Sequence, residues 1–346
     1  MEESSVNGHE RKRSALRSMV RRALKRRSVM VVLVGLVLAG YIAFRVAAYN
    51  GVIIVTHGAR RIAPGQLPLP TGDDNEFSIF VVGDTGKDSP RRSDVVNAMR
   101  RRRSASRVDA VFLAGDNFYE AGVTSMLDPR FQVDFEQLFG KDDFDMPFYV
   151  CLGNHDHYGN VDAQVQYSRL SSRWKMPNAY YRFSQSIGTE TVDVFVIDTV
   201  PIAERHPSAN EQLNWLREEL ANSDAHWKIV MGHHPAISGG RHDASVSIRE
   251  TLSELFRQYG VDVYVSGHDH DLQLIDSHQG WLQLVSGAGS KLRSTSWIDQ
   301  TIYAKSTPGY CWLAIRQEEL YVSFFSPVEH LLTYTVRKPV TTQIRR

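Results

Sequence analysis

The chain has 346 residues, of which 42% are hydrophobic and 23% charged, and its formal net charge is +1. These values are ordinary for a globular protein, so they exclude a disordered chain and a polytopic membrane protein. The first 28 residues carry a net charge of +6, which leaves −5 for the rest of the chain. The rest therefore gives no electrostatic reason to expect nucleic-acid binding.

An apolar stretch follows this basic block. Val29–Phe44 is unbroken, and residues 29–49 approach the roughly 20 residues that span a bilayer. Because basic flanks stay cytosolic, we predict a cytosolic tail over residues 1–28 and a transmembrane signal anchor over residues 29–49. The folded domain would then be luminal, in the secretory or endolysosomal pathway, or extracellular. The alternative is a cleaved signal peptide and a secreted protein, since Val46-Ala47-Ala48 offers small residues for cleavage.

Residues 50–75 contain three prolines and four glycines, and we expect them to form a linker to one domain over residues 76–340. Short β-branched runs there alternate with helical patterns. The expected strands are Phe77–Val82, Val108–Ala114, Pro147–Leu152, Asp193–Ile197, Trp227–Met231 and Asp262–Ser266, and the expected helices surround Ser93–Arg103, Pro129–Phe139, Asn210–Leu220 and Ser247–Tyr259. This alternation predicts parallel sheets covered by helices. Strand patterns dominate from Gln273 onward, which predicts a second sheet packed on the first.

Five of these runs end in glycine followed at once by a polar residue. The pairs are Gly83-Asp84, Gly115-Asp116, Gly153-Asn154, Gly232-His233 and Gly267-His268. Side chains just past the carboxyl ends of parallel strands converge on one crevice, and glycine allows the backbone to turn there. Such a polar cluster is costly unless a cation holds it, and oxygen and imidazole ligands favour iron, manganese or zinc. The two cysteines, Cys151 and Cys311, provide no cysteine metal site.

The segments GDTG, GDNFY, GNHDH, GHHP and GHDH occur in the order found in metallophosphoesterases. The Tyr that follows Asp by three residues in GDNFY resembles the purple acid phosphatases, in particular the small tartrate-resistant group. The resemblance extends over residues 77–340. It implies an α/β fold, a two-sheet sandwich flanked by helices in four α/β/β/α layers, and a dinuclear metal centre of Fe(III) with Fe(II), Zn(II) or Mn(II).

The resemblance also assigns roles to individual residues. It places Asp84, Tyr119 and His270 at the ferric site, Asn154, His233 and His268 at the second metal, and Asp116 between the two metals. His155 and His242 correspond to the two histidines that lie near the substrate. His234 is not expected to be a ligand, whereas His157 is either a residue of the pocket mouth or an exposed loop histidine.

The expected activity is hydrolysis of phosphate monoesters by an acid phosphatase. A metal-bound hydroxide would attack phosphorus, and His242 or His155 would protonate the leaving group. One alternative on the same fold is a phosphodiesterase or pyrophosphatase for nucleotide-type substrates. Another is an iron redox protein that generates reactive oxygen species. The expected partners are the phosphate monoester substrate and the membrane, nucleic acid is not expected, and the protein should be a monomer.

Overall fold

The computed structural model of the chain describes residues 60–62, 75–242 and 245–338. The predicted basic tail (1–28) and signal anchor (29–49) lie outside these residues. Within the described part, no helix combines the length and the apolar character needed to cross a membrane.

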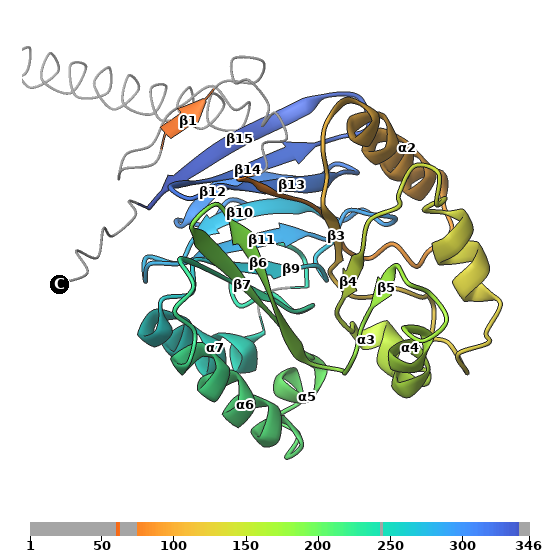
Figure 1. The fold of residues 1–346 in the computed structure, drawn as a ribbon, viewed down its shortest axis with the longest axis horizontal. Coiled ribbons are helices and arrows are strands. Elements are labelled where there is room, and N and C mark those ends of the chain that lie inside the picture. The colour runs from red at the N-terminus through yellow and green to blue at the C-terminus, as the bar shows by residue number, and fades with distance from the viewer. Residues whose placement is uncertain (1–59, 63–74, 243–244, 339–346) are drawn as a thin grey trace, which may run out of the picture. The chain divides into compact units, whose positions relative to one another are not determined.

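The first sheet has eight strands in the order β1-β15-β14-β13-β2-β3-β4-β5 (Figure 1). Its strands are β1 (Arg60–Ile62), β2 (Phe77–Val82), β3 (Ala110–Leu113), β4 (Phe148–Val150), β5 (Trp174–Lys175), β13 (Tyr310–Ile315), β14 (Glu319–Phe325) and β15 (His330–Arg337). Strands β2 to β5 are parallel to one another, and all six residues of β2 are buried. A strand that is buried along its whole length is typical of a parallel strand covered on both faces.

The second sheet has seven strands in the order β12-β10-β11-β9-β8-β7-β6. Its strands are β6 (Tyr181–Ile187), β7 (Glu190–Val196), β8 (Trp227–Met231), β9 (Val263–Ser266), β10 (Leu272–Asp276), β11 (Leu282–Ser286) and β12 (Thr301–Lys305). Here β7, β8, β9 and β11 form the parallel core. Each sheet therefore directs the carboxyl ends of its central strands toward one edge.

One detail of the sequence prediction is wrong. The C-terminal strands do not form the second sheet by themselves, because β10–β12 extend the sheet of β7–β9 whereas β13–β15 extend the sheet of β2–β5. Each parallel core leaves an edge whose backbone groups need partners, and the C-terminal strands supply partners to both cores. In addition, β1 lies inside the expected linker, and it pairs antiparallel with the otherwise open edge of β15.

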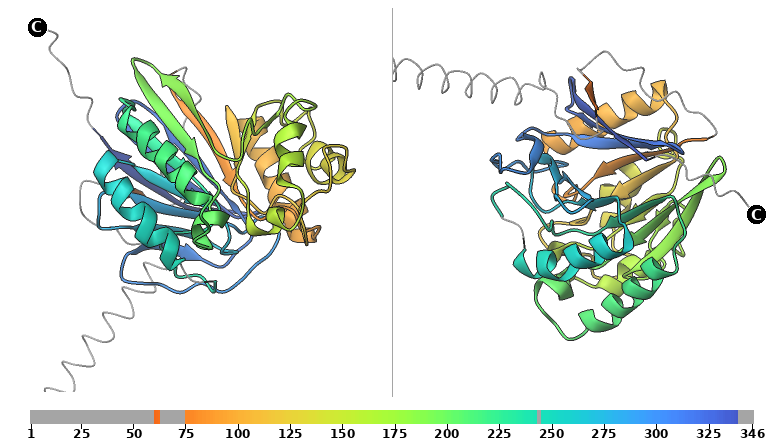
Figure 2. Two further views of the ribbon diagram at one scale, coloured as in Figure 1. Left: turned by 90° about the horizontal axis from the view of Figure 1, so that it is seen from below. Right: turned by 90° about the vertical axis from the view of Figure 1, so that its left-hand side faces the viewer.

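Helices cover the outer faces of the two sheets, which confirms the predicted four-layer sandwich (Figure 2). Those following strands of the first sheet are α2 (Pro90–Ala105), a π-helical segment (Phe131–Gln137), α3 (Asn154–His157) and α4 (Val161–Tyr167). Those of the second sheet are α5 (Val200–Ala203), α6 (Ala209–Ala221) and α7 (Val246–Tyr259). Ser89 caps α2 by accepting the Arg92 N–H, and Gly260 ends α7 in a left-handed conformation.

Candidate metal centre

The strand ends of the two sheets meet at the edge that the glycine motifs predicted. The N–H of Gly83, after β2, donates to Ser286 of β11 at 2.7 Å, which joins the first sheet to the second. The N–H of Gly267, after β9, donates to the His233 carbonyl, after β8, at 3.1 Å. The Asp84 N–H donates to the Gly115 carbonyl at 3.0 Å, and the His155 N–H donates to Asp116 Oδ1 at 2.9 Å, so that all five motifs lie together.

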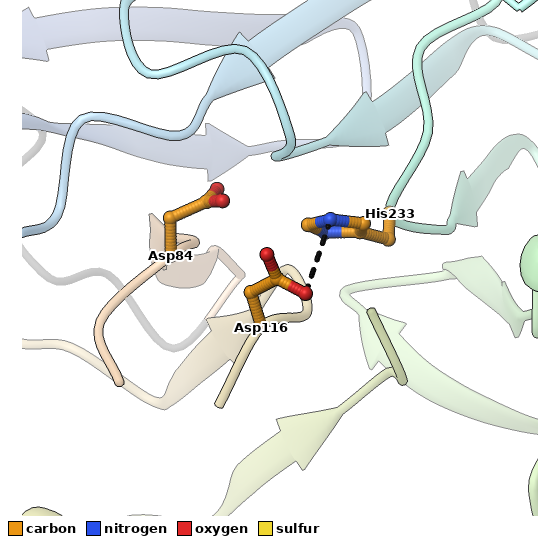
Figure 3. Close-up of side chains that lie close together, drawn as sticks. All are labelled: Asp84, Asp116 and His233. Carbon is orange, nitrogen blue, oxygen red and sulfur yellow. Dashed lines mark ion pairs between the residues drawn. The ribbon is translucent and has the colours of Figure 1, made fainter. Parts of the chain in front are cut away.

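A buried trio forms the middle of the site. Asp84, Asp116 and His233 offer ligand atoms that lie within 4.8 Å of one another, and their exposed fractions are 0%, 2% and 0% (Figure 3). His233 Nε2 lies 3.4 Å from Asp116 Oδ1. Two carboxylates buried this deeply with one imidazole form a group that can hold a cation.

Tyr119 and His270 extend the trio on the Asp84 side. The Tyr119 hydroxyl oxygen lies 2.9 Å from Asp84 Oδ1 and 2.7 Å from Asp116 Oδ2, so it can donate its proton to either carboxylate. His270 Nε2 lies 3.3 Å from the same oxygen of Asp84. Tyr119 and His270 therefore both contact Asp84, the third residue assigned to the ferric site.

Asn154 and His268 extend the trio on the His233 side. His233 Nε2 lies 3.2 Å from Asn154 Oδ1 and 3.2 Å from His268 Nδ1. The other ring nitrogen of His233 lies 2.9 Å from the Ala114 carbonyl, to which it can only donate. In the neutral ring, Nε2 is then left with its lone pair toward the cluster, as a metal-binding imidazole requires.

The charges of this cluster fit a bound cation. Burial alone would lower the pKa of His233, but the facing carboxylates of Asp116 and Asp84 raise that pKa to about 10. Burial also opposes ionisation of Asp116, yet His233 and the Tyr119 hydroxyl hold its pKa well below the usual range. The buried carboxylates thus favour a positive charge next to them, and without a metal that charge is a proton on His233. A hard or borderline metal ion would supply the positive charge instead.

The two histidines expected near the substrate lie on either side of the cluster. His155 faces the Tyr119 ring at 4.3 Å between ring centres, and its Nδ1 lies 2.6 Å from the Glu120 carbonyl, to which it donates. His242 faces the His268 ring at 4.6 Å. Burial and the charge of Arg293 lower the pKa of His242 below its ordinary value.

The sequence analysis expected glycine to allow the backbone turn at each motif, but most of the motif glycines do not adopt a conformation that requires glycine. Among the five motif glycines only Gly115 has a positive φ, of 85°. Asp84, Asp116 and His268 instead take the left-handed conformation themselves, with φ of 58°, 53° and 67°. Each such residue costs of order 1–3 kcal/mol, and strain of this kind concentrates at functional sites.

Several supporting residues escaped the sequence analysis. The Asp156 carboxylate accepts the N–H groups of Gly153 at 2.8 Å and Asn117 at 3.1 Å, which shapes two of the motif loops. The Thr199 hydroxyl accepts the His233 and His234 N–H groups at 3.3 and 3.1 Å. The sequence did contain a signal for Thr199, because this polar residue comes just after strand β7, as the motif residues come just after their strands. It was missed because no glycine precedes it.

His234 and His157, which the sequence analysis did not place among the ligands, both have hydrogen-bond partners. His234 is buried, and its Nδ1 lies 2.9 Å from the Thr199 hydroxyl. His157 Nε2 lies 2.9 and 3.1 Å from the two carboxylate oxygens of Asp198. His157 is therefore paired with a carboxylate and is not a free loop histidine.

Comparison with known proteins identifies the class to which this site belongs. Residues 77–272 match the family model for calcineurin-like phosphoesterases. Tartrate-resistant acid phosphatase type 5 of Oryctolagus cuniculus is 32% identical over 75% of this chain and 90% of its own length. Purple acid phosphatase 3 of Arabidopsis thaliana is 30% identical over 82% of this chain and 84% of its own length. Among solved structures, GAP50, the anchor in the inner membrane complex of Plasmodium, matches with a TM-score of 0.68 and 24% identity, over 78% of this chain and 90% of that chain.

The fold and the cluster of carboxylates and imidazoles at its edge are those of a metal-dependent phosphoesterase. The chain belongs to the calcineurin-like phosphoesterases and, within them, to the purple acid phosphatases of the tartrate-resistant type.

Proposed function

We propose that the chain is an acid phosphatase that hydrolyses phosphate monoesters at a dinuclear centre of Fe(III) with Fe(II), Zn(II) or Mn(II). The observation that carries this proposal is the position of the Tyr119 hydroxyl between the carboxylates of Asp84 and Asp116. A phenolate oxygen beside two carboxylates forms a hard, anionic ligand set that suits Fe(III). Asn154, His233 and His268 would hold the second metal, with Asp116 shared.

Two bound metals would supply neutralisation of the phosphate oxygens and a hydroxide nucleophile at acid pH. The chain itself must deliver a proton to the leaving oxygen as its bond to phosphorus breaks. His242 and His155 are the candidates because both flank the cluster. The Glu120 carbonyl accepts from His155 Nδ1, which leaves Nε2, 4.0 Å from Asp116, as the nitrogen that faces the site. We assign the acid role to His242, with His155 as a second donor to the phosphate.

Metal analysis and an absorption spectrum of the purified protein test this proposal together with turnover of an aryl phosphate. The wild-type protein should be purple or pink and active at acid pH, and Tyr119→Phe should lose the colour. A colourless, active enzyme that contains only zinc or manganese would contradict the ferric assignment. Preference for a nucleotide-type diester, or radical production without phosphate release, would instead support the two alternatives raised by the sequence.

We also propose that residues 29–49 anchor the enzyme in a membrane, with the catalytic domain on the luminal or extracellular side. The support is the basic block ahead of an apolar run of near-spanning length. Protease added to sealed vesicles should leave the domain intact until detergent is added, and carbonate should not extract it. A mature N-terminus near Tyr49 would show cleavage and a secreted enzyme.

A further inference from the structure

The side chains of residues 268–273 contact two different parts of the molecule, the metal cluster and a neighbouring loop. The two histidines of this segment reach the metal cluster. Asp269 and Gln273 contact instead the loop over residues 238–242, whose last residue is His242. One short stretch of chain therefore touches both the candidate metal ligands and the loop that carries the candidate acid.

The Asp269 carboxylate forms the centre of this second contact. Its Oδ1 accepts the backbone N–H of His242 at 2.9 Å, and its Oδ2 accepts the Ser238 hydroxyl. Asp269 is fully buried, and a Cβ added to Gly240 would lie only 2.3 Å from its carboxyl carbon. The loop therefore packs directly against the carboxylate, with glycine at the point of closest approach.

Further hydrogen bonds hold the base of the loop from two sides. Gln273 Oε1 accepts the Gly239 N–H at 2.8 Å, and Gln273 Nε2 donates to Ser238 Oγ at 3.0 Å. On the other side, the Gly239 carbonyl accepts the Ser296 N–H at 2.8 Å. The base of the loop is thus fixed before the chain reaches His242.

The imidazole of His242 is exposed, and its ring centre lies 4.6 Å from that of His268 and 5.7 Å from that of His270. The backbone N–H of His242 donates to Asp269, so this hydrogen bond fixes the residue that carries the ring. A reacting group held by a supporting shell keeps its geometry, whereas a displacement of about 1 Å can cost on the order of 10²-fold in rate.

We propose that Asp269 is a positioning residue that places His242 for proton delivery to the leaving group. This inference rests on the acid role given to His242 under the proposed function. Asp269 acts through the backbone of the 238–242 loop and does not itself meet the substrate. Since His268 and His270 flank it in sequence, the acid and the metal ligands are placed by the same few residues.

The test is a double-mutant cycle on the full chain with its metals bound. Asp269→Ala, His242→Ala and the double variant are compared across aryl and alkyl phosphates of increasing leaving-group pKa. Asp269→Ala should lower kcat for alkyl phosphates by about 10²-fold, lower it less for aryl phosphates, and leave KM nearly unchanged. In the His242→Ala background the same change should cost under about twofold, because the two residues act as a unit.

Two further variants protect the test against loss of metal or fold in Asp269→Ala. Asp269→Asn keeps Oδ1 for the His242 N–H and should restore part of the rate. Gly240→Ala pushes the loop off the carboxylate without a substitution in residues 268–270, and it should reproduce the leaving-group pattern with the colour and metal content intact. Asp276→Asn, at the far end of β10, is the matched control and should leave the profile unchanged.

Independent, multiplicative losses in the double variant would overturn the inference, as would equal losses across the leaving-group series in Gly240→Ala with its metals bound. A flat leaving-group profile for His242→Ala alone would instead remove the acid role from His242. The cycle distinguishes the two failures because it measures the coupling between Asp269 and His242, whatever His242 does for the substrate.

Discussion

The Lys291 ammonium nitrogen lies 3.8 Å from the centre of the Tyr119 ring. The Glu120 carboxylate, 3.7 Å from the same nitrogen, helps to hold it there. The preceding residue, Ser290, donates its hydroxyl proton to the Asp84 carbonyl, so the segment is fixed to the candidate metal centre. A cation over an aromatic ring is attracted to it, and the attraction grows when the ring becomes a phenolate.

Lys291→Met tests this contact through colour. The ammonium stabilises negative charge on the Tyr119 oxygen, so its removal should shift the phenolate-to-iron absorption band to longer wavelength. Lys87→Met is the control, because Lys87 pairs with the same Glu120 at 2.7 Å. An unchanged spectrum in Lys291→Met, or an equal shift in both variants, would contradict the assigned contact.

Asp128 holds the loop that precedes the π-helical segment. Its carboxylate accepts the Thr124 N–H at 2.9 Å and the Arg130 guanidinium at 2.9 Å. Arg130 in turn donates to the carbonyls of Ala121 and Gly122 at 2.6 and 2.8 Å. The hydrogen bonds from Arg130 hold the pKa of Asp128 well below its usual range, although burial opposes this.

The pH dependence of stability follows from this shift. Because the folded-state pKa of Asp128 is depressed, its stabilisation is present above the unfolded-state pKa of about 3.9 and is lost as the pH falls through the folded-state value. Asp128→Asn should lower the free energy of unfolding by about 1.5–3 kcal/mol at pH 5–7, and the difference should shrink below about pH 4. Urea unfolding at several pH values measures this difference in the free energy of unfolding. Asp145→Asn, at an exposed pair with Arg103, should cost under about 1 kcal/mol, and a pH-independent loss in Asp128→Asn would contradict the prediction.

Removal of the metals should destabilise the domain. The Asp84 and Asp116 carboxylates are almost completely buried, and both residues are held in left-handed backbone conformations. A cation that binds only the folded state stabilises it by mass action. Chelation should therefore lower the Tm by several degrees, and Fe(III) together with Zn(II) should restore it. An identical Tm with and without metal would show that the cluster is stable alone.

The sequence was sufficient to place the motifs because the underlying strands are mostly apolar and mostly buried. Phe77–Val82 and Trp227–Met231 have the predicted bounds, since such runs end abruptly where glycine and a polar residue follow. Allocation of the C-terminal strands to two sheets could not be predicted, because the residues of a strand such as β10 or β13 do not specify which strand it pairs with. Their pairing depends on which edge is open, and this is a tertiary property.

The same limit applies to the site. The motifs and the family resemblance predicted the nine candidate residues, and contacts in the structure link all nine, whereas their roles toward metal and substrate stay predictions. Asp269 and Lys291 support that set through contacts distant in sequence: Asp269 lies 27 residues from the His242 N–H that it accepts. Neither position carries a local signal of its function, since a polar residue beside a histidine or in a loop is common.

The role of Gly153 was misread from sequence in a way that yields a sharp prediction. Gly153 has an ordinary extended conformation, with φ of −110°, so conformational freedom is not what requires glycine there. A Cβ at this position would instead lie 2.2 Å from Asp116 Oδ1 and 2.3 Å from the Asp116 backbone nitrogen. The loop before Asn154 and the loop that carries Asp116 therefore touch with no room for a methyl group.

Gly153→Ala should consequently displace the Asp116 carboxylate, the one residue expected to contact both metals. Overpacking of this kind costs about 1–3 kcal/mol, which the domain should survive, whereas a displaced shared ligand should reduce the bound metal and abolish the colour. Metal content per folded chain is the readout, with circular dichroism to confirm the fold. Gly140→Ala is the matched control, because the nearest atom to its added Cβ is 3.9 Å away, and it should keep both metals. A Gly153→Ala protein with full metal content and wild-type turnover would show that the two loops can separate, and the close approach of Gly153 to Asp116 would then not be needed for the site.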